Sequence, residues 1–411
     1  MKPKRTMYLE KILRLMAIII LKRHRPFVIG ITGSVGKSSA KDATYLVLKN
    51  NFKVRKSIGN YNNEIGIPLT VIGAKSGGKN PLKWIFIFLK WLFLVISPVG
   101  YPKILILEMA TDHPGDMKYL TGFIPVKIAI VTDISLSHLK FFKNVKQISK
   151  EKTALAKSIP QDGLAILNLD NHWISDFSKK FDKHFIGFGI DSPAEIRASD
   201  IKIIYKNSKL NGLSFKLNFK GKTIPFRLPN IIGKHQVYAV LPAIAVANFF
   251  KINLIEAIKR LNNFQSPKGR MNLLRGINNS LIIDDSYNAS PLSVNMALKS
   301  VSEIKANRKA VVLGDMLELG NRSKMEHQNI ISGILENDEI KILILVGERM
   351  KDAFQVVSDN KTFSKRVLIF DNSEEAINNI LKEIKIFKND LILVKGSRAM
   401  KMEKIIDKLI L

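Results

Sequence analysis

The sequence predicts an α/β fold built on wound, mainly parallel β-sheets. Short apolar runs without polar alternation recur along the chain, as expected for strands buried on both faces of a parallel sheet, and helical stretches separate them. The predicted strands are residues 27–32, 104–107, 128–132, 164–167, 281–283, 310–313, 342–346, 367–370 and 391–394. Residues 194–228 alternate polar and apolar side chains instead, which predicts a local antiparallel insertion.

Composition narrows the class of protein. The chain has 411 residues, with 46% hydrophobic and 24% charged side chains, which are globular proportions. Lys and Arg number 65 against 35 Asp and Glu, so the formal charge is +30 and the expected partners are anionic. Absence of cysteine excludes disulfides, thiolate metal sites and cysteine nucleophiles, and agrees with a reducing cytosol.

Two apolar segments precede or interrupt the first sheet. Residues 9–21 follow a basic start but lack a small-residue cleavage site, so they predict a basic amphipathic helix and not a signal peptide. Residues 84–99 are shorter than the ~20 residues that span a bilayer, and Lys90 interrupts them. Two interpretations stay open for this second segment, a helix lying in an anionic interface and a helix packed on the rest of the protein.

The order of these elements predicts three parts. Residues 1–26 are the basic helix, residues 27–268 a central α/β domain with the apolar insertion 79–100, and residues 269–411 a C-terminal α/β domain. The polar stretch 262–270, which contains Pro and Gly, marks the boundary between the two larger parts.

The strongest chemical signal lies where the first strand meets the first helix of the central part. Residues 32–39 read TGSVGKSS, a glycine turn that directs backbone N–H groups, the helix dipole and Lys37 at phosphate, with the Ser38 hydroxyl for a metal ion. The strict phosphate-loop pattern needs a glycine where Ile31 stands. The sequence therefore predicts a variant of the nucleotide triphosphate loop.

Further motifs resemble those of the Mur ligase superfamily, the ATP-dependent amide ligases. The resemblance covers about residues 28–411, and its motifs are NYNNEIGIP (60–68), EMATDHPGD (108–116), TDI with His138 and Leu139, GR at 269–270, DDSYNASP (284–291), LGDMLELG (313–320) and VKGSR (394–398). The last three are similar to the branch that joins D-Ala-D-Ala to a UDP-muramoyl-tripeptide. The fold that this implies is a P-loop central domain and a Rossmann-like C-terminal domain.

The resemblance implies a catalytic centre with ATP and two Mg²⁺ ions. Lys37 would bind phosphate, Ser38 and Glu108 would hold one Mg²⁺, and His138 would help hold the second. Mg²⁺ prefers oxygen ligands, so Glu108 suits this role by its own chemistry, whereas His138 is assigned by the resemblance alone. Lys152 would be carbamylated and so become an oxygen ligand; the alternative that it is a solvated lysine on a helix stays open. Where the family has an acidic residue two positions later, this chain has Ala154.

The resemblance also implies residues for nucleotide and substrate. The complete set for ATP is Thr32, Gly33, Ser34, Gly36, Lys37, Ser38, Ser39, Gln236, Arg270, Asp284 and Asp285. Gln236 replaces the asparagine that reads adenine in the family, and Ala239 replaces a second one. Lys395 would meet the transferred phosphoryl group. Asn60, Asn62, Asn63, Asn288 and Arg398 are expected to bind substrate.

The expected function is ATP-dependent ligation in cell-wall precursor synthesis by a cytoplasmic monomer, with peripheral contact to an anionic inner membrane face as an alternative setting. About 27 residues precede the first strand, too few for the separate domain that holds the UDP end in this branch, so the UDP-sugar is expected to bind elsewhere or another carboxylate replaces it. A same-chemistry ligase of a poly-amino-acid or cofactor tail is the second interpretation. A basic nucleic-acid-binding protein is the third, although no nucleic-acid-binding motif accompanies the charge.

Overall fold

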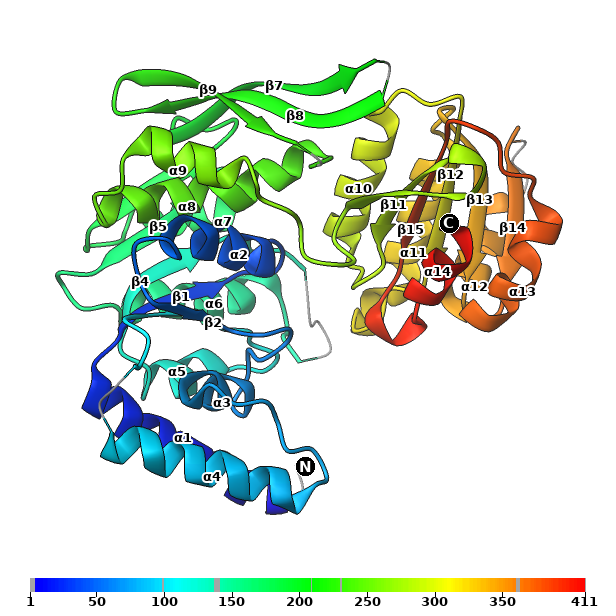
Figure 1. The fold of residues 1–411 in the computed structure, drawn as a ribbon. Helices are drawn as coiled ribbons and strands as arrows, with labels where there is room; N and C mark the ends of the chain where they lie inside the picture. The colour runs from blue at the N-terminus through cyan, green and yellow to red at the C-terminus, as the bar shows by residue number, and fades with distance from the viewer. Residues whose placement is uncertain are drawn as a thin grey trace.

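A computed structural model describes residues 4–410 except 98–99, 137–140, 208, 230 and 360–362. Figure 1 shows two α/β bodies side by side, each formed around one sheet. The first contains α1 (Lys4–His24), β1 (Phe27–Thr32), α2 (Lys37–Leu48), β2 (Val54–Lys56), α3 (Gly66–Ile72), α4 (Pro81–Ile96), β3 (Ile104–Glu108), α5 (Asp116–Thr121), β4 (Val126–Val131), α6 (Val145–Ser158), β5 (Leu164–Asn168), α7 (His172–Ser178), β6 (Phe185–Gly189), β7 (Ile196–Lys206), β8 (Lys209–Phe219), β9 (Lys222–Leu228), α8 (Val237–Phe249) and α9 (Leu254–Leu261).

The first sheet has the order β2-β3-β1-β4-β5-β6-β7-β8-β9 among the described residues. Its strands are parallel from β2 to β7, and β7–β9 are antiparallel. The antiparallel segment predicted for 194–228 is therefore present, and it extends the parallel sheet: Phe188 of β6 pairs with Ile196 of β7. The α/β fold predicted from the apolar runs is confirmed.

Apolar side chains on both faces of this sheet explain why its strands lack alternation. One face packs against α2 and α8, with Ile29, Ile31 and Ile106 in the core. The other packs against a layer that includes α1, α3 and α6, and contains Val28, Leu105 and Leu107. Each central strand thus buries successive residues on opposite sides, which needs a continuous apolar run.

The second body repeats the same principle on a smaller scale. It contains β10 (Asn272–Arg275), β11 (Leu281–Asp285), α10 (Pro291–Glu303), β12 (Arg308–Gly314), α11 (Ser323–Leu335), β13 (Ile340–Val346), α12 (Glu348–Ser358), β14 (Arg366–Phe370), α13 (Ser373–Glu383), β15 (Asp390–Lys395) and α14 (Glu403–Leu409). The strand order is β10-β11-β15-β12-β13-β14, with β10 the antiparallel edge strand. Apolar clusters fill both faces of the sheet.

Direct contacts join the two bodies beside the connecting loop. Lys234 forms an ion pair of 2.9 Å with Glu303 of α10, and the Tyr205 hydroxyl accepts a hydrogen bond of 2.9 Å from the backbone N–H of Lys305. The β7–β8 hairpin also packs Ile203 and Leu210 against the apolar core of the second body. These contacts lie at the β7–α10 side of the molecule (Figure 1).

The α1 and α4 helices pack on each other and on α3. Residues 84–96 of the apolar segment therefore belong to a helix that packs on the rest of the protein along one side. Trp91 donates a hydrogen bond from Nε1 to the Met16 carbonyl (3.0 Å), and His24 Nε2 lies 2.8 Å from the Leu94 carbonyl. Arg14 belongs to the predicted basic amphipathic helix but does not lie on a free basic face, because its guanidinium lies 4.8 Å from the Tyr119 ring centroid. Tertiary contact with α5 thus pulls this arginine inward. No helix in the described part of the chain is long and apolar enough to cross a membrane.

Candidate active site

The loop between β1 and α2 forms a phosphate-sized cradle. Gly36 has φ 87° and caps the N-terminus of α2, where backbone N–H groups and the helix dipole favour an anion. Gly33 has φ 151°, and a Cβ there would lie 2.0 Å from Thr132 Oγ1. The two glycines are therefore required by geometry, and the missing glycine at position 31 is not, because Ile31 is a core residue of β1.

Lys37 closes this loop from inside. Its Nζ donates to the carbonyls of Gly33 (2.6 Å) and Ser34 (3.3 Å), and burial lowers its pKa from the ordinary value. Thr32 Oγ1 is fully buried nearby and has no hydrogen-bond partner among the described residues. A buried polar atom without a partner costs stability unless a ligand or solvent supplies one. The glycine loop and the unpartnered Thr32 Oγ1 therefore fit a bound phosphate group.

Glu108 ends β3 beside the loop. Its Oε2 accepts hydrogen bonds from Ser38 Oγ (2.9 Å) and Lys41 Nζ (3.1 Å), and its Oε1 accepts one from Asn62 Nδ2 (3.3 Å). Burial alone would raise the pKa of Glu108, but the Lys41 and Lys37 charges hold it below its ordinary value. The carboxylate is thus ionised, and with Ser38 it provides two oxygen ligands of the kind that Mg²⁺ uses together with phosphate oxygens.

Lys152 of α6 is buried, with 2% of its surface exposed. Its Nζ lies 3.4 Å from Thr111 Oγ1, and burial, followed by repulsion from Lys37, lowers its pKa to about 7. The alternative of a solvated lysine is therefore wrong. No cluster of three or more His, Asp or Glu side chains that could hold a metal occurs among the described residues. The predicted ligand His138, with Leu139, lies outside the described residues.

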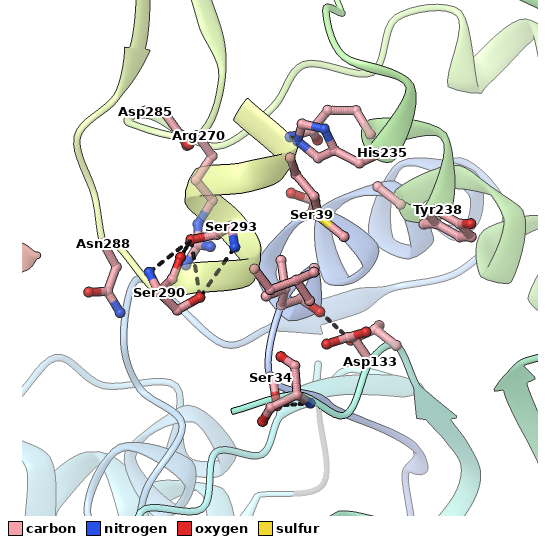
Figure 2. Close-up of a pocket in the computed structure, with 18 of the residues that line it drawn as sticks. Ser34, Ser39, Asp133, His235, Tyr238, Arg270, Asp285, Asn288, Ser290 and Ser293 are labelled. Carbon is pink, nitrogen blue, oxygen red and sulfur yellow. Dashed lines mark hydrogen bonds between the residues drawn. The ribbon is translucent and has the colours of Figure 1, made fainter. Parts of the chain in front are cut away.

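A cavity of about 420 Å³ lies between the two bodies and begins at the phosphate loop. The first body contributes Ser34, Gly36, Ser39 and Gln236 among the predicted residues, and the second contributes Asp285, Asn288 and Lys395, with Arg270 from the connection between them. Figure 2 shows Ser34 and Ser39 on one side and Arg270, Asp285 and Asn288 on the other. Residues from distant segments thus meet around one space.

Lys395 and Asp285 form a buried ion pair on the second wall. Lys395 Nζ donates to Asp285 Oδ2 (2.6 Å) and to the Asn288 carbonyl (2.9 Å). Burial raises the pKa of Asp285 in spite of this lysine. Arg270 lies with its guanidinium 4.4 Å from the Tyr287 ring centroid, and its charge contributes to the lowered pKa values of both Lys37 and Glu108. Arg270 therefore faces the phosphate loop from the opposite wall.

The residues predicted for adenine and ribose divide into two groups. Gln236 lines the cavity, where its Oε1 accepts a hydrogen bond of 3.2 Å from Ser266 Oγ. Asp284 instead accepts hydrogen bonds from its own turn, from Ser286 Oγ (2.6 Å) and the Ser286 backbone N–H (3.1 Å). Of the two aspartates, Asp285 is therefore the one at the cavity, because successive residues of β11 point to opposite faces.

Several predicted substrate residues lie outside this cavity. Asn63 Oδ1 accepts the backbone N–H of Gly66 (2.9 Å) at the start of α3, and Asn60 is exposed on the same loop. Arg398 forms an ion pair of 3.3 Å with Glu403. In the LGDMLELG motif the fold covers the backbone of Gly314, since a Cβ there would lie 2.7 Å from the Met402 sulfur. The LGDMLELG segment instead caps α12, where Asp315 Oδ1 accepts the Met350 N–H (3.0 Å).

One wall of the cavity is formed by residues that none of the sequence motifs predicts. Asp170 accepts a hydrogen bond from the Tyr238 hydroxyl (2.7 Å), and Asn171 donates to Asp133 Oδ1 (2.9 Å), all four lining the cavity. The signal was available, because Asp170 and Asn171 follow the carboxyl end of β5, where ligand sites of parallel sheets occur.

A phosphate loop that faces a cationic second body across one cavity defines a two-domain, nucleotide-using enzyme. Residues 96–247 match the Mur ligase middle domain, and residues 269–398 match the Mur ligase glutamate ligase domain. The UDP-N-acetylmuramoyl-tripeptide–D-alanyl-D-alanine ligase of Buchnera aphidicola subsp. Baizongia pistaciae is 31% identical over 93% of this chain and 75% of its own length. The Bacillus subtilis enzyme of the same name is 29% identical, over 93% and 76%.

Solved structures agree with the fold. MurF from Acinetobacter baumannii superposes with a TM-score of 0.80 at 22% identity, covering 97% of this chain and 80% of that one. MurF from Thermotoga maritima, in complex with ADP, gives 0.80 at 22% identity, covering 97% and 83%. The chain belongs to the Mur ligase family, and the predicted family, the P-loop central body and the Rossmann-like C-terminal body are confirmed.

Proposed function

We propose that this protein is an ATP-dependent amide ligase that joins D-Ala-D-Ala to a UDP-muramoyl-tripeptide through an acyl phosphate, in peptidoglycan precursor synthesis. One observation carries the proposal: the phosphate loop, through Ser34, Gly36 and Ser39, and the wall with Arg270 and Lys395 face the same cavity from two separate sheets. A ligase needs this division, because the nucleotide and the amine must meet only when both are bound.

In the first step, a carboxylate oxygen of the tripeptide attacks the γ-phosphorus of ATP, the bond to the β-phosphate oxygen breaks, and ADP leaves. Both reactants are anions, so their repulsion is the main barrier. The N-terminus of α2 and Lys37 would neutralise the phosphates on one side, and Arg270 would do so on the other. Their placement on opposite walls supports these roles.

In the second step, the amine of D-Ala-D-Ala attacks the acyl carbon, phosphate leaves, and the amine loses a proton. Asn288 lines the cavity at the start of α10 and carries both donor and acceptor groups for a zwitterionic dipeptide. Lys395 is held by Asp285 and by the Asn288 carbonyl, so it would contact the leaving phosphate from the same side as the amine.

We also propose that Lys152 is carbamylated. Its neutral Nζ would add to CO₂, forming an N–C bond and releasing one proton, and the product is a carboxylate-like anion. Burial supplies what this reaction needs, because a pKa lowered to about 7 leaves much of the amine neutral at physiological pH. The anion would also remove a buried positive charge next to Lys37.

Two Mg²⁺ ions complete the proposed site, and their chemistry is to neutralise phosphate charge and align the reacting oxygens. Ser38 and Glu108 would hold one ion, since Ser38 Oγ and Glu108 Oε2 already lie 2.9 Å apart. Carbamylated Lys152 would be a ligand of the second, with His138 as its expected partner. The ion pair between Lys41 and Glu108 would keep the carboxylate ionised until metal arrives.

We further propose that the enzyme is a cytoplasmic monomer with three parts, residues 1–26, 27–268 and 269–411. It would also make a peripheral contact with an anionic membrane face. The absence of cysteine supports a reducing compartment. Two separate sheets with their own apolar cores support the division between the larger parts.

The decisive assay measures ADP release with UDP-muramoyl-tripeptide and a panel of amines. D-Ala-D-Ala should stimulate release far more than L-Ala-L-Ala or single amino acids, and the ligated peptide should appear by mass spectrometry. Equal stimulation by L-glutamate would favour a ligase of poly-amino-acid tails. ATP binding without stimulation by any amine would refute the proposed substrate pair.

A further inference from the structure

The α4 helix carries a continuous apolar surface that the fold leaves uncovered. Phe86 is 71% exposed and Phe93 is 62% exposed, whereas Ile87 and Leu94 on the opposite side are buried against α1 and the central body. The exposed apolar residues of α4, here called the α4 ridge, are Leu82, Ile85, Phe86, Phe88, Leu89, Leu92, Phe93 and Ile96. A patch of this kind on a water-soluble surface marks an interaction site.

The ridge has the geometry of a helix lying in an interface. At ~100° per residue, its eight side chains occupy an arc of about 160°. Lys83 and Lys90 fall together along one edge of this arc, and Lys79 lies just before the helix; all three are exposed. Lys90 donates a hydrogen bond from its Nζ to the Gly73 carbonyl, whereas Lys79 and Lys83 can extend their ammonium groups to phosphates while their stems remain among apolar groups.

Charge around the ridge favours an anionic occupant. No Asp or Glu occurs between residues 65 and 107, and Glu10 is the single acidic residue in residues 1–41. The neighbouring α1 ends in Lys22 and Arg23, both exposed, and Arg23 Nη2 donates to the Ile96 carbonyl (3.4 Å) at the end of α4. Tyr8, Ile12 and Leu15 are further exposed apolar residues, on α1. Apolar and cationic groups are thus combined on one pair of helices.

The attachment of α4 determines how it could enter a bilayer. Trp91 and His24 tie it to α1 through hydrogen bonds, and Asn80 caps its start by accepting the Lys83 N–H. The helix is therefore held alongside α1, and its whole length faces outward. A ridge of long side chains fits the deformable acyl boundary of a membrane better than it fits a preformed protein groove. Figure 1 shows α1 and α4 at the end of the first body opposite β7–β9.

We propose that the α4 ridge docks this protein on a bilayer surface that contains anionic phospholipid, with the exposed Lys83 of α4 and Lys22 and Arg23 of α1 at the headgroups. The ridge lies apart from the residues that line the cavity, so docking leaves the cavity accessible. This proposal does not depend on the ligase reaction, and it is measured without turnover.

The test uses the whole protein and sedimentation with vesicles of phosphatidylcholine containing about one third phosphatidylglycerol. Wild type should sediment with these vesicles, and much less with pure phosphatidylcholine or in about 0.5 M salt. Absence of sedimentation with the anionic vesicles would overturn the proposal.

Variants separate the ridge from general basicity. The double variant Phe86→Glu/Phe93→Glu should bind more than about tenfold more weakly, because it removes apolar area from the bilayer, while its thermal stability and ADP release stay unchanged. The matched control Met325→Glu/Val356→Glu replaces exposed apolar residues of α11 and α12 and should bind as wild type does. Equally weakened vesicle binding in both double variants would refute the role of the α4 ridge in docking. So would a wild-type dimer in solution that Phe86→Glu/Phe93→Glu makes monomeric, since a second copy would then be the occupant.

Discussion

Replacing Lys152 tests the proposal that its buried amine is carbamylated and so becomes an anion. At about pH 7.5, a lysine with a pKa of about 7 is roughly three-quarters neutral, whereas one at 10.5 is neutral in about one molecule in a thousand. The neutral form that reacts with CO₂ is thus enriched several hundredfold by the position of Lys152 in α6. We expect Lys152→Ala to lose at least about 100-fold in ADP release, because the proposed carbamate ligand of the second metal would be removed.

Rescue and control variants distinguish this role from a structural one. Formate or acetate should restore part of the activity of Lys152→Ala by supplying carboxylate oxygens, and not that of Lys152→Met, whose side chain fills the space. Lys150 is exposed on the same helix, so Lys150→Ala should behave as wild type. Wild-type activity should fall in CO₂-depleted buffer and return with bicarbonate, and ¹³C-labelled CO₂ should give a carbamate NMR signal. A fully active Lys152→Ala enzyme, or wild-type activity indifferent to CO₂, would refute the reasoning.

Three further predictions follow from the site. Lys37→Ala should lower ADP release at least about 100-fold with unchanged circular dichroism, and wild-type turnover would contradict the phosphate-loop assignment. Arg270→Met should raise the KM for ATP about tenfold, measured by initial rates, and an unchanged KM would place Arg270 outside the phosphate site. Burial, then Lys395, lowers the pKa of His235 to about 4. The unfolded chain therefore binds more protons between pH 4 and 6.5, and stability should rise with pH across this window. In denaturant titrations His235→Asn should flatten that rise, and an unchanged slope would contradict the neutral state of His235.

Local sequence patterns predicted the α/β class, which the structure confirms, and a phosphate loop before Lys37, which stays a prediction. Buried parallel strands leave a local mark, because both faces of each strand must be apolar, and the glycine turn before Lys37 is a contiguous motif. Asp285, Arg270 and Lys395 were also found from local motifs, although their meeting in one cavity was not visible until the two sheets were placed. The family of the chain rests on the same contiguous segments.

Tertiary structure alone decided which side chains are buried and which are free. The sequence left two interpretations open for Lys152, a carbamylated ligand and a solvated helix residue, and only packing with distant segments shows that it is buried. Packing likewise turns Arg14 onto Tyr119. Asp284 and Asp285 are indistinguishable in sequence until β11 is fixed between β10 and β15. The apolar run of α4 likewise predicts burial and exposure equally well, and the outcome depends on α1 covering one side of the helix. Burial is a property of contacts between distant segments, so a local pattern cannot specify it.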